Sequence, residues 1–157
     1  MKIPITEICD IERTVKDKIY PAGTVYLQVS ATHGQILMTE SIQTLEPGKY
    51  VVFKPKRLID SCYLKEVLSL AMPNFVKTYM TGINIQVGEL KRLEIEWIEN
   101  VQEQRLFVGN IEKLNTAISN EQQCIERLKE FKKQMLSRMF PQEDRNATNR
   151  RDYEPNK

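Results

Sequence analysis

The chain has 157 residues, of which 41% are hydrophobic and 28% are charged, and its formal net charge is +2. This length allows one domain plus an extension, and the ordinary apolar content supports a packed core. The near-neutral charge excludes an overwhelmingly basic nucleic-acid-binding protein, so any contact with DNA must rest on a local patch.

The targeting and redox features indicate a cytoplasmic protein. The three cysteines, Cys9, Cys62 and Cys124, are an odd number without metal-ligand spacing, which is typical of reduced cytosolic thiols. We expect Cys62 and Cys124 to be small buried hydrophobic residues. No signal peptide is expected, because residues 1–4 lead into no long apolar run, and no apolar stretch approaches transmembrane length.

Residues 1–98 are predicted to form a compact α+β domain. Residues 3–11 combine an extended start with a short helical pattern. Aromatic and β-branched residues at 24–29, 36–38 and 50–53 predict strands, and turns rich in glycine and proline separate them. Together these elements predict a small mixed or antiparallel sheet with short helices.

Helical periodicity follows the last of these strands. A helix capped by Asp60 or Ser61 is predicted to end before Pro73. Pro73 is expected to begin a second, short helix over residues 74–80.

The end of the domain shows alternating polarity. Residues 83–87 fit either a strand or an extended loop, and residues 88–92 fit a turn or a helical turn. Over residues 93–98, apolar side chains alternate with glutamates. We expect these glutamates to form a solvated face, not a pair of acid/base carboxylates.

The last third of the chain is predicted to be one long helix over residues 99–140, followed by a disordered tail over 141–157. Apolar residues step through it in alternating threes and fours, the spacing of a coiled-coil seam. The seam consists of Phe107, Ile111, Leu114, Ile118, Ile125, Leu128, Met135 and Met139.

An isolated helix cannot bury such a stripe, so it must meet a partner. Phe107 and Ile111 can pack on their own domain, but from Ile118 onward we predict pairing with another chain. Glu121 and Lys132 interrupt the seam. Parallel pairing would stack each of them on its own copy, which favours an antiparallel pair.

Three stretches of the sequence resemble the specificity subunit of type I restriction–modification enzymes. Residues 81–86, followed by 90–95, resemble the segment that closes a target-recognition domain. Glu103-Gln104-Arg105 resembles the beginning of the long conserved helix of that family, and residues 129–142 resemble its usual end.

The resemblance implies a non-catalytic subunit whose target-recognition domains each read one half of a split DNA site. A full-length member carries two such domains and two long helices, which pair antiparallel as a spacer. Methyltransferase subunits that modify adenine dock around it, and a translocating restriction subunit can join them. Since this chain has one domain and one helix, we expect a homodimer of half-subunits on double-stranded DNA.

The candidate DNA-contacting residues combine cations for phosphates with polar groups for base edges. Asn84 and Gln86 are the strongest candidates, because they alternate with apolar residues and their amides would emerge on one face. The candidates are Thr32, His33, Gln35, Lys54, Lys56, Arg57, Asn84, Gln86 and Lys91. An ordinary solvated surface is the alternative for each, and the two amides can equally satisfy loop backbone groups.

A second hypothesis is a coiled-coil interaction protein that pairs with a full-length specificity subunit, or with methyltransferase subunits, without reading DNA sequence. It predicts salt-sensitive DNA binding at most. An enzyme ranks last, because His33 is the only histidine and no serine or cysteine has a recognisable base. We therefore expect no catalytic residue, metal or cofactor.

Overall fold

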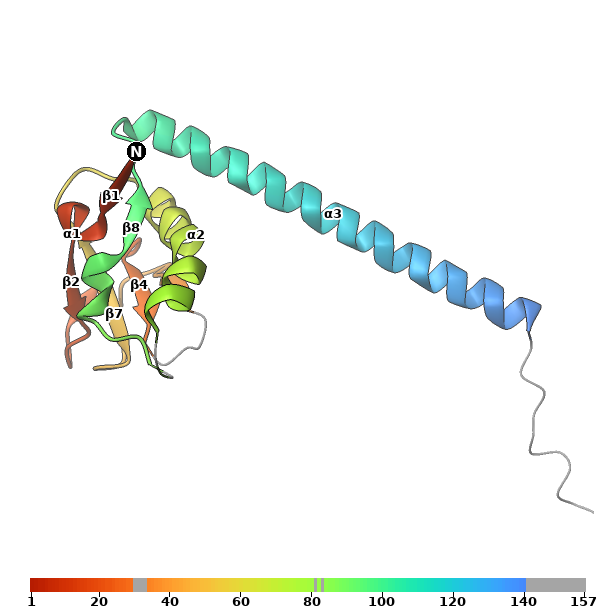
Figure 1. The fold of residues 1–157 in the computed structure, drawn as a ribbon, viewed down its shortest axis with the longest axis horizontal. Helices are drawn as coiled ribbons and strands as arrows, with labels where there is room; N and C mark the ends of the chain where they lie inside the picture. The colour runs from red at the N-terminus through yellow and green to blue at the C-terminus, as the bar shows by residue number, and fades with distance from the viewer. Residues whose placement is uncertain (30–33, 81, 83, 141–157) are drawn as a thin grey trace, which may run out of the picture. The chain divides into compact units, whose positions relative to one another are not determined.

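The computed structural model describes residues 1–29, 34–80, 82 and 84–140. It divides into two units, Met1–Glu112 and Lys113–Lys157. The first unit, called the body below, holds the described strands and the first turns of the long helix α3 (Figure 1). The predicted α+β architecture, with one long helix after a small sheet, is confirmed.

A four-stranded antiparallel sheet forms the centre of the body. Its order is β2-β7-β4-β5, with the strands β2 Cys9–Arg13, β7 Tyr50–Pro55, β4 Val25–Gln28 and β5 Ile36–Met38. Phe53 lies opposite Ile11 on one side and Val25 on the other. The strands predicted at 24–29, 36–38 and 50–53 are therefore confirmed.

Two short antiparallel ladders complete the strands of the body. β1 Lys2–Pro4 pairs with β8 Glu94–Glu96, which brings the two ends of the body together, and β3 Ile19–Tyr20 pairs with β6 Gln43–Thr44. Between β1 and β2, the chain forms a single helical turn, α1 Ile5–Ile8. The helical pattern predicted over residues 3–11 is thus limited to this turn.

The helix α2 runs without a break over Ser61–Tyr79, so the predicted helix end at Pro73 is wrong. A proline inside a helix costs about 3 kcal/mol. Burying Met72 and Phe75 on either side of Pro73 offsets this cost, because a large apolar side chain contributes about 1.5–3 kcal/mol when buried. Pro73 itself is exposed, so water can reach the carbonyl of Ser69 that loses its helical donor.

Asp60 caps the beginning of α2, as one of the two predicted alternatives. Its Oδ1 accepts hydrogen bonds from the backbone N–H groups of Cys62 at 3.0 Å and Tyr63 at 3.2 Å. These two donors have no partner within the first turn of a helix, so the cap satisfies them. Asp60 thereby fixes where the helix begins.

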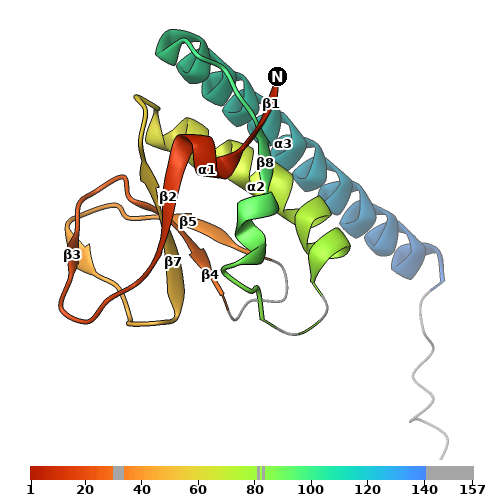
Figure 2. The same cartoon turned by 60° about the vertical axis from the view of Figure 1, so that its left-hand side comes forward.

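The main core lies between the sheet and α2 (Figure 2). Tyr63, Leu64 and Leu68 of α2 are fully buried there against Leu27 and Phe53 of the sheet. A smaller cluster of Tyr20, Leu45 and Val52 covers the other sheet face, where β3 lies (Figure 2). The sheet is therefore buried on both faces, but unequally.

The described residues between α2 and η1 return to the core and form no strand. Ile85 is buried, and its N–H donates to the carbonyl of Val29 at 3.1 Å, which corresponds to the predicted extended loop. A 3-10 turn, η1 Glu89–Arg92, leads into β8. On β8, Ile95 is buried while Glu94 and Glu96 are exposed, so the predicted solvated glutamate face is confirmed.

The helix α3 covers Val101–Met139, and the amide of Gln104 joins its first turn to the rest of the body. Gln104 is fully buried. Its Nε2 donates to the carbonyl of Ile98 at 2.7 Å, and its Oε1 accepts from the N–H of Asp60 at 2.9 Å. One side chain therefore connects the beginning of α3, the beginning of α2 and the end of the β8 segment.

Tyr63 supports the same junction from inside the core. Its hydroxyl donates to the carbonyl of Glu96 at 2.7 Å and accepts from the N–H of Ile98 at 3.1 Å. The ring of Phe107 packs edge-on against Tyr63, with 5.6 Å between the centroids. Phe107 thus packs on its own body, which the sequence analysis had proposed for Phe107 and Ile111, and not on another chain.

The apolar seam of α3 changes character beyond the body. Phe107 and Ile111 are half-buried, whereas the seam residues of the second unit are 46% to 65% exposed. The exposed members are Leu114, Ile118, Ile125, Leu128, Met135 and Met139. Among the described residues, no helix is both long and apolar enough to cross a membrane.

Replacing Gln104 with leucine should lower the free energy of unfolding by about 2–4 kcal/mol, because the Asp60 N–H and the Ile98 carbonyl would both lose their buried partner. The measurement is urea unfolding followed by tryptophan fluorescence of Trp97. Gln102→Leu is the control, since Gln102 is exposed and should change stability by less than about 0.5 kcal/mol. Equal effects of the two substitutions would contradict the role given to Gln104.

Candidate nucleic-acid interface

The predicted DNA-contacting residues fall into two groups at opposite ends of α2. Lys54, Lys56 and Arg57 lie at the end of β7 and just after it, before α2 begins. Gln35, Asn84 and Gln86 lie near its C-terminal end. Since α2 has 19 residues, its ends are separated by roughly 28 Å at 1.5 Å per residue. Thr32 and His33 lie outside the described residues.

The C-terminal end of α2 holds two chain segments close together. Gly34, beside Gln35, has a φ of +60° and packs so tightly that an added Cβ would lie 2.5 Å from Met72 Cε and 3.3 Å from Val76 and Ile85. Ile85 is anchored in turn to Val29. Asn84 and Gln86 flank the buried Ile85 and are both exposed, so their side chains lie on the outer side, as the alternation predicted.

Asn84 and Gln86 line a groove of about 510 Å³, which we call the amide groove. Its wall on α2 includes Phe75, Thr78 and Tyr79, and η1 contributes Glu89 and Arg92. The groove therefore offers amide donors and acceptors, a guanidinium group and an aromatic ring. Base edges in DNA are read by amides and guanidinium groups of this kind.

Tyr79 and Arg92 are members of this groove that the sequence analysis did not select. The guanidinium carbon of Arg92 lies 5.7 Å from the centroid of the Tyr79 ring, and Phe75 packs on that ring at 5.2 Å. Arg92 also pairs with Glu89 at 3.3 Å. The predicted Lys91 is exposed beside Arg92 but does not line the groove.

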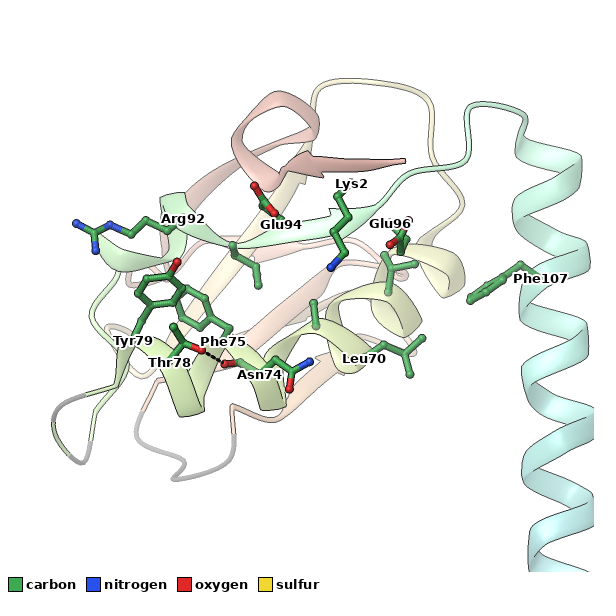
Figure 3. A pocket seen from close by; sticks show the side chains of 13 residues that line it. Lys2, Leu70, Asn74, Phe75, Thr78, Tyr79, Arg92, Glu94, Glu96 and Phe107 are labelled. Atoms are coloured by element: carbon green, nitrogen blue, oxygen red, sulfur yellow. Dashed lines mark hydrogen bonds between the residues drawn. The ribbon is translucent and has the colours of Figure 1, made fainter.

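A second groove, of about 500 Å³, adjoins the first and shares Phe75, Thr78, Tyr79 and Arg92 with it (Figure 3). It runs between α2 and the β1-β8 ladder, and Phe107 of α3 lines its other end. In Figure 3, Lys2 points from β1 toward α2. Leu70, which is 58% exposed, makes this second groove more apolar than the amide groove.

At the N-terminal end of α2, one of the three basic residues Lys54, Lys56 and Arg57 is already bound within the body. Lys56 pairs with Asp10 at 2.9 Å and donates to the carbonyl of Thr6 at 2.9 Å, so its charge is already partnered. Lys54 and Arg57 are exposed and remain suited to contact phosphates. The whole body has thirteen lysines and arginines against fourteen aspartates and glutamates, so its basic residues act only locally.

The cysteines differ from what the sequence predicted. Cys62 and Cys124 are exposed, so the expectation that they are buried is wrong. Cys62 lies on the outer face of α2, and Cys124 lies in the second unit beside the exposed seam.

Burial raises the pKa of the Cys9 thiol to about 12, so it stays protonated at neutral pH. Among the described residues, no group of three histidines, cysteines or carboxylates is arranged to hold a metal.

Comparison with known proteins gives structural matches only. No family model and no curated protein matches the chain. The S subunit of a type I restriction–modification system from M. genitalium matches with a TM-score of 0.59 at 15% identity, over 83% of this chain and 42% of that one. The chain has the fold of type I specificity subunits.

Two further structures give the same result. The HsdS subunit from Thermoanaerobacter tengcongensis matches with a TM-score of 0.59 at 14% identity, over 79% of this chain and 39% of that one. A structure described as showing complex assembly and conformational transition of the type I R-M system matches with a TM-score of 0.61 at 15% identity, over 88% and 43%. The chain thus spans about two fifths of the length of each of the three matched chains.

Replacing Gly34 with alanine should lower the free energy of unfolding by about 2–4 kcal/mol, because a left-handed backbone and a crowded Cβ are both penalised. Gly48→Ala is the matched control. Gly48 has a φ of +72° but no neighbour within 4 Å of an added Cβ, so only about 1 kcal/mol is expected. Thermal unfolding measures both. Equal losses would show that Gly34 does not pack against α2 as described.

Proposed function

We propose that this protein is a non-catalytic DNA-recognition subunit of a type I restriction–modification system, acting as a homodimer of half-subunits. One observation carries the proposal: over about four fifths of its length the chain has the specificity-subunit fold, and this region holds one body and one long helix whose apolar seam is exposed. Two copies would therefore supply two bodies and two long helices, the number that the full-length family carries.

The exposed seam of α3 supports pairing between copies. The six apolar seam residues from Leu114 to Met139 are each about half exposed or more. An amphipathic helix with such a stripe is stabilised by packing on another helix. A homodimer with twofold symmetry buries the same stripe on both copies.

The amide groove supports DNA reading by the body. Asn84 and Gln86 present two exposed amides beside the guanidinium of Arg92. Amides pair bidentately with adenine and guanidinium groups with guanine. In a twofold dimer, two such grooves would read an inverted, split site, and the paired helices would set the gap between its halves. Methyltransferase subunits would dock on this scaffold, and a restriction subunit would be a further partner.

Replacing Ile118, Ile125 and Leu128 together with aspartate should convert the dimer into a monomer, because three charges per helix would have to be buried in the pairing face. Light-scattering mass measures the change. The thermal transition of the body should stay within a few degrees, since these residues lie in the second unit.

The matched control replaces residues on the outer side of the same helix, Gln123 and Glu130, with alanine. This variant should remain dimeric. A wild-type chain that is monomeric at micromolar concentration would contradict the homodimer. Mixing the wild-type chain with methyltransferase subunits from the same source should give one complex of larger mass, and the triple aspartate variant should not form it.

Replacing Asn84 and Gln86 with alanine should reduce the preference for the recognised DNA over unrelated DNA by at least roughly tenfold, because each well-placed bidentate contact contributes about 1–3 kcal/mol of discrimination. Fluorescence anisotropy with both DNAs measures the preference. Gln43→Ala, at an exposed amide on β6, is the control and should leave it unchanged. An unchanged preference in the Asn84 and Gln86 variant would remove the amide groove from sequence reading.

A second candidate function is a coiled-coil modulator that pairs with a full-length specificity subunit, or with methyltransferase subunits, without reading sequence. The body favours it in one respect, because acidic residues slightly outnumber basic ones. This candidate predicts DNA binding that weakens steeply with salt and shows no preference among sequences. The anisotropy measurement above separates the two functions.

A further inference from the structure

The seam residues of α3 follow a heptad repeat, so their order can be compared with that of a second copy running in the opposite direction. With a seam in which a and d positions alternate, Ile118, Ile125, Lys132 and Met139 occupy a, and Leu114, Glu121, Leu128 and Met135 occupy d. In an antiparallel pair, an a residue of one helix faces a d residue of the other. The face therefore pairs with a second copy of itself in a few discrete registers, one heptad apart.

We propose that α3 pairs with a second copy in the antiparallel register that places Glu121 opposite the partner's Lys132. The proposal rests on the homodimer proposed above and specifies its geometry. The twofold axis then passes between Glu126 and Arg127. Each copy contributes the carboxylate of Glu121 and the ammonium of Lys132. The twofold symmetry therefore gives two equivalent pairs, and both interruptions of the seam face an opposite charge.

The same register matches every exposed apolar member of the seam. Ile125 faces the partner's Leu128, and Ile118 faces the partner's Met135. Leu114 faces the partner's Met139. Counting both copies, six apolar layers accompany the two charged layers, and all six exposed apolar residues of the seam in the second unit become covered.

The two neighbouring registers are less favourable. A shift of one heptad toward the beginning of the helix again gives six apolar layers, but it places Glu121 opposite Ile125 and Lys132 opposite Leu114. Four charges would then face apolar side chains, which costs free energy because no partner compensates their desolvation. A shift of one heptad the other way leaves fewer apolar layers.

The contacts of the body point to the same choice. The shift toward the beginning of the helix needs Phe107 and Ile111 as pairing residues. These two are half-buried within the body, and Phe107 packs on Tyr63. The proposed register begins at Leu114, just after the body ends at Glu112, and uses residues of the second unit alone.

The residues beside the seam are compatible with this register. Cys124 lies next to the partner's Phe131, and Gln122 lies next to the partner's Lys129. Neither contact joins like charges. Within its own helix, Glu121 has no charged residue three or four positions away, so its charge is free to pair between chains.

A charge-swap cycle tests the register. E121K places two lysines opposite each other and K132E places two glutamates opposite each other, so each should raise the dimer dissociation constant by at least roughly tenfold. The double variant E121K/K132E restores opposite charges and should return to within roughly threefold of wild type. Sedimentation equilibrium measures the constants, and circular dichroism checks that each variant keeps its helix.

Glu130→Lys and Lys133→Glu are the matched controls, since they make the same charge changes on the outer side of the helix and should leave dimerisation unchanged. In a parallel pair, the singles and the double would all behave like wild type. A wild-type dimer with no rescue in the double variant would overturn the register but keep the homodimer. A monomeric wild-type chain would overturn both.

Spin labels provide an independent measurement on the full chain, with Cys62 and Cys124 replaced by serine. In the proposed register, labels at position 113 of the two chains are separated by roughly 40 Å along the helix axis. Labels at position 127 of the two chains are separated by only a few Å along the same axis. A parallel pair would give equal distances at the two positions. Equal distances would therefore contradict the proposal.

Discussion

The buried amide of Gln104 is the constraint on which the arrangement of the body depends. It satisfies the N–H of Asp60, which caps α2, and the carbonyl of Ile98, which ends the β8 segment. A buried polar group without a partner costs more than a formed hydrogen bond contributes. Gln104 therefore determines together where α2 and α3 begin and how the β8 segment ends. It belongs to the stretch Glu103-Gln104-Arg105 that carries part of the family resemblance, but the sequence pattern did not predict that its amide would be buried.

This junction separates two roles within one helix. Up to Glu112, α3 is part of the body, and Phe107 is an element of its core. From Lys113 onward, the same helix presents an exposed apolar face whose only interruptions are one acid and one base. A face of that composition is suited to a second copy of itself, because an antiparallel mate brings the acid to the base. Under the proposed function, DNA recognition would lie on the body and assembly on the second unit.

The sequence predicted what short-range patterns determine. The strands around Val25, Ile36 and Val51 follow from β-branched and aromatic runs, and the exposed seam follows from heptad spacing. It did not predict what tertiary packing determines: α2 continues through Pro73 because the core holds both sides of it. The groove residues Tyr79 and Arg92 were missed for the same reason, since their meeting depends on that continuation and on the turn η1.

Selection of bound sequences from random double-stranded DNA tests the central claim most directly, that a twofold pair of these chains reads DNA. The chain, assembled with methyltransferase subunits from the same source, would be used to enrich DNA over several rounds. The account predicts two inverted copies of one short half-site, separated by a constant number of unspecified bases. Enrichment of a single half-site, of copies with variable spacing, or of no sequence at all would contradict it.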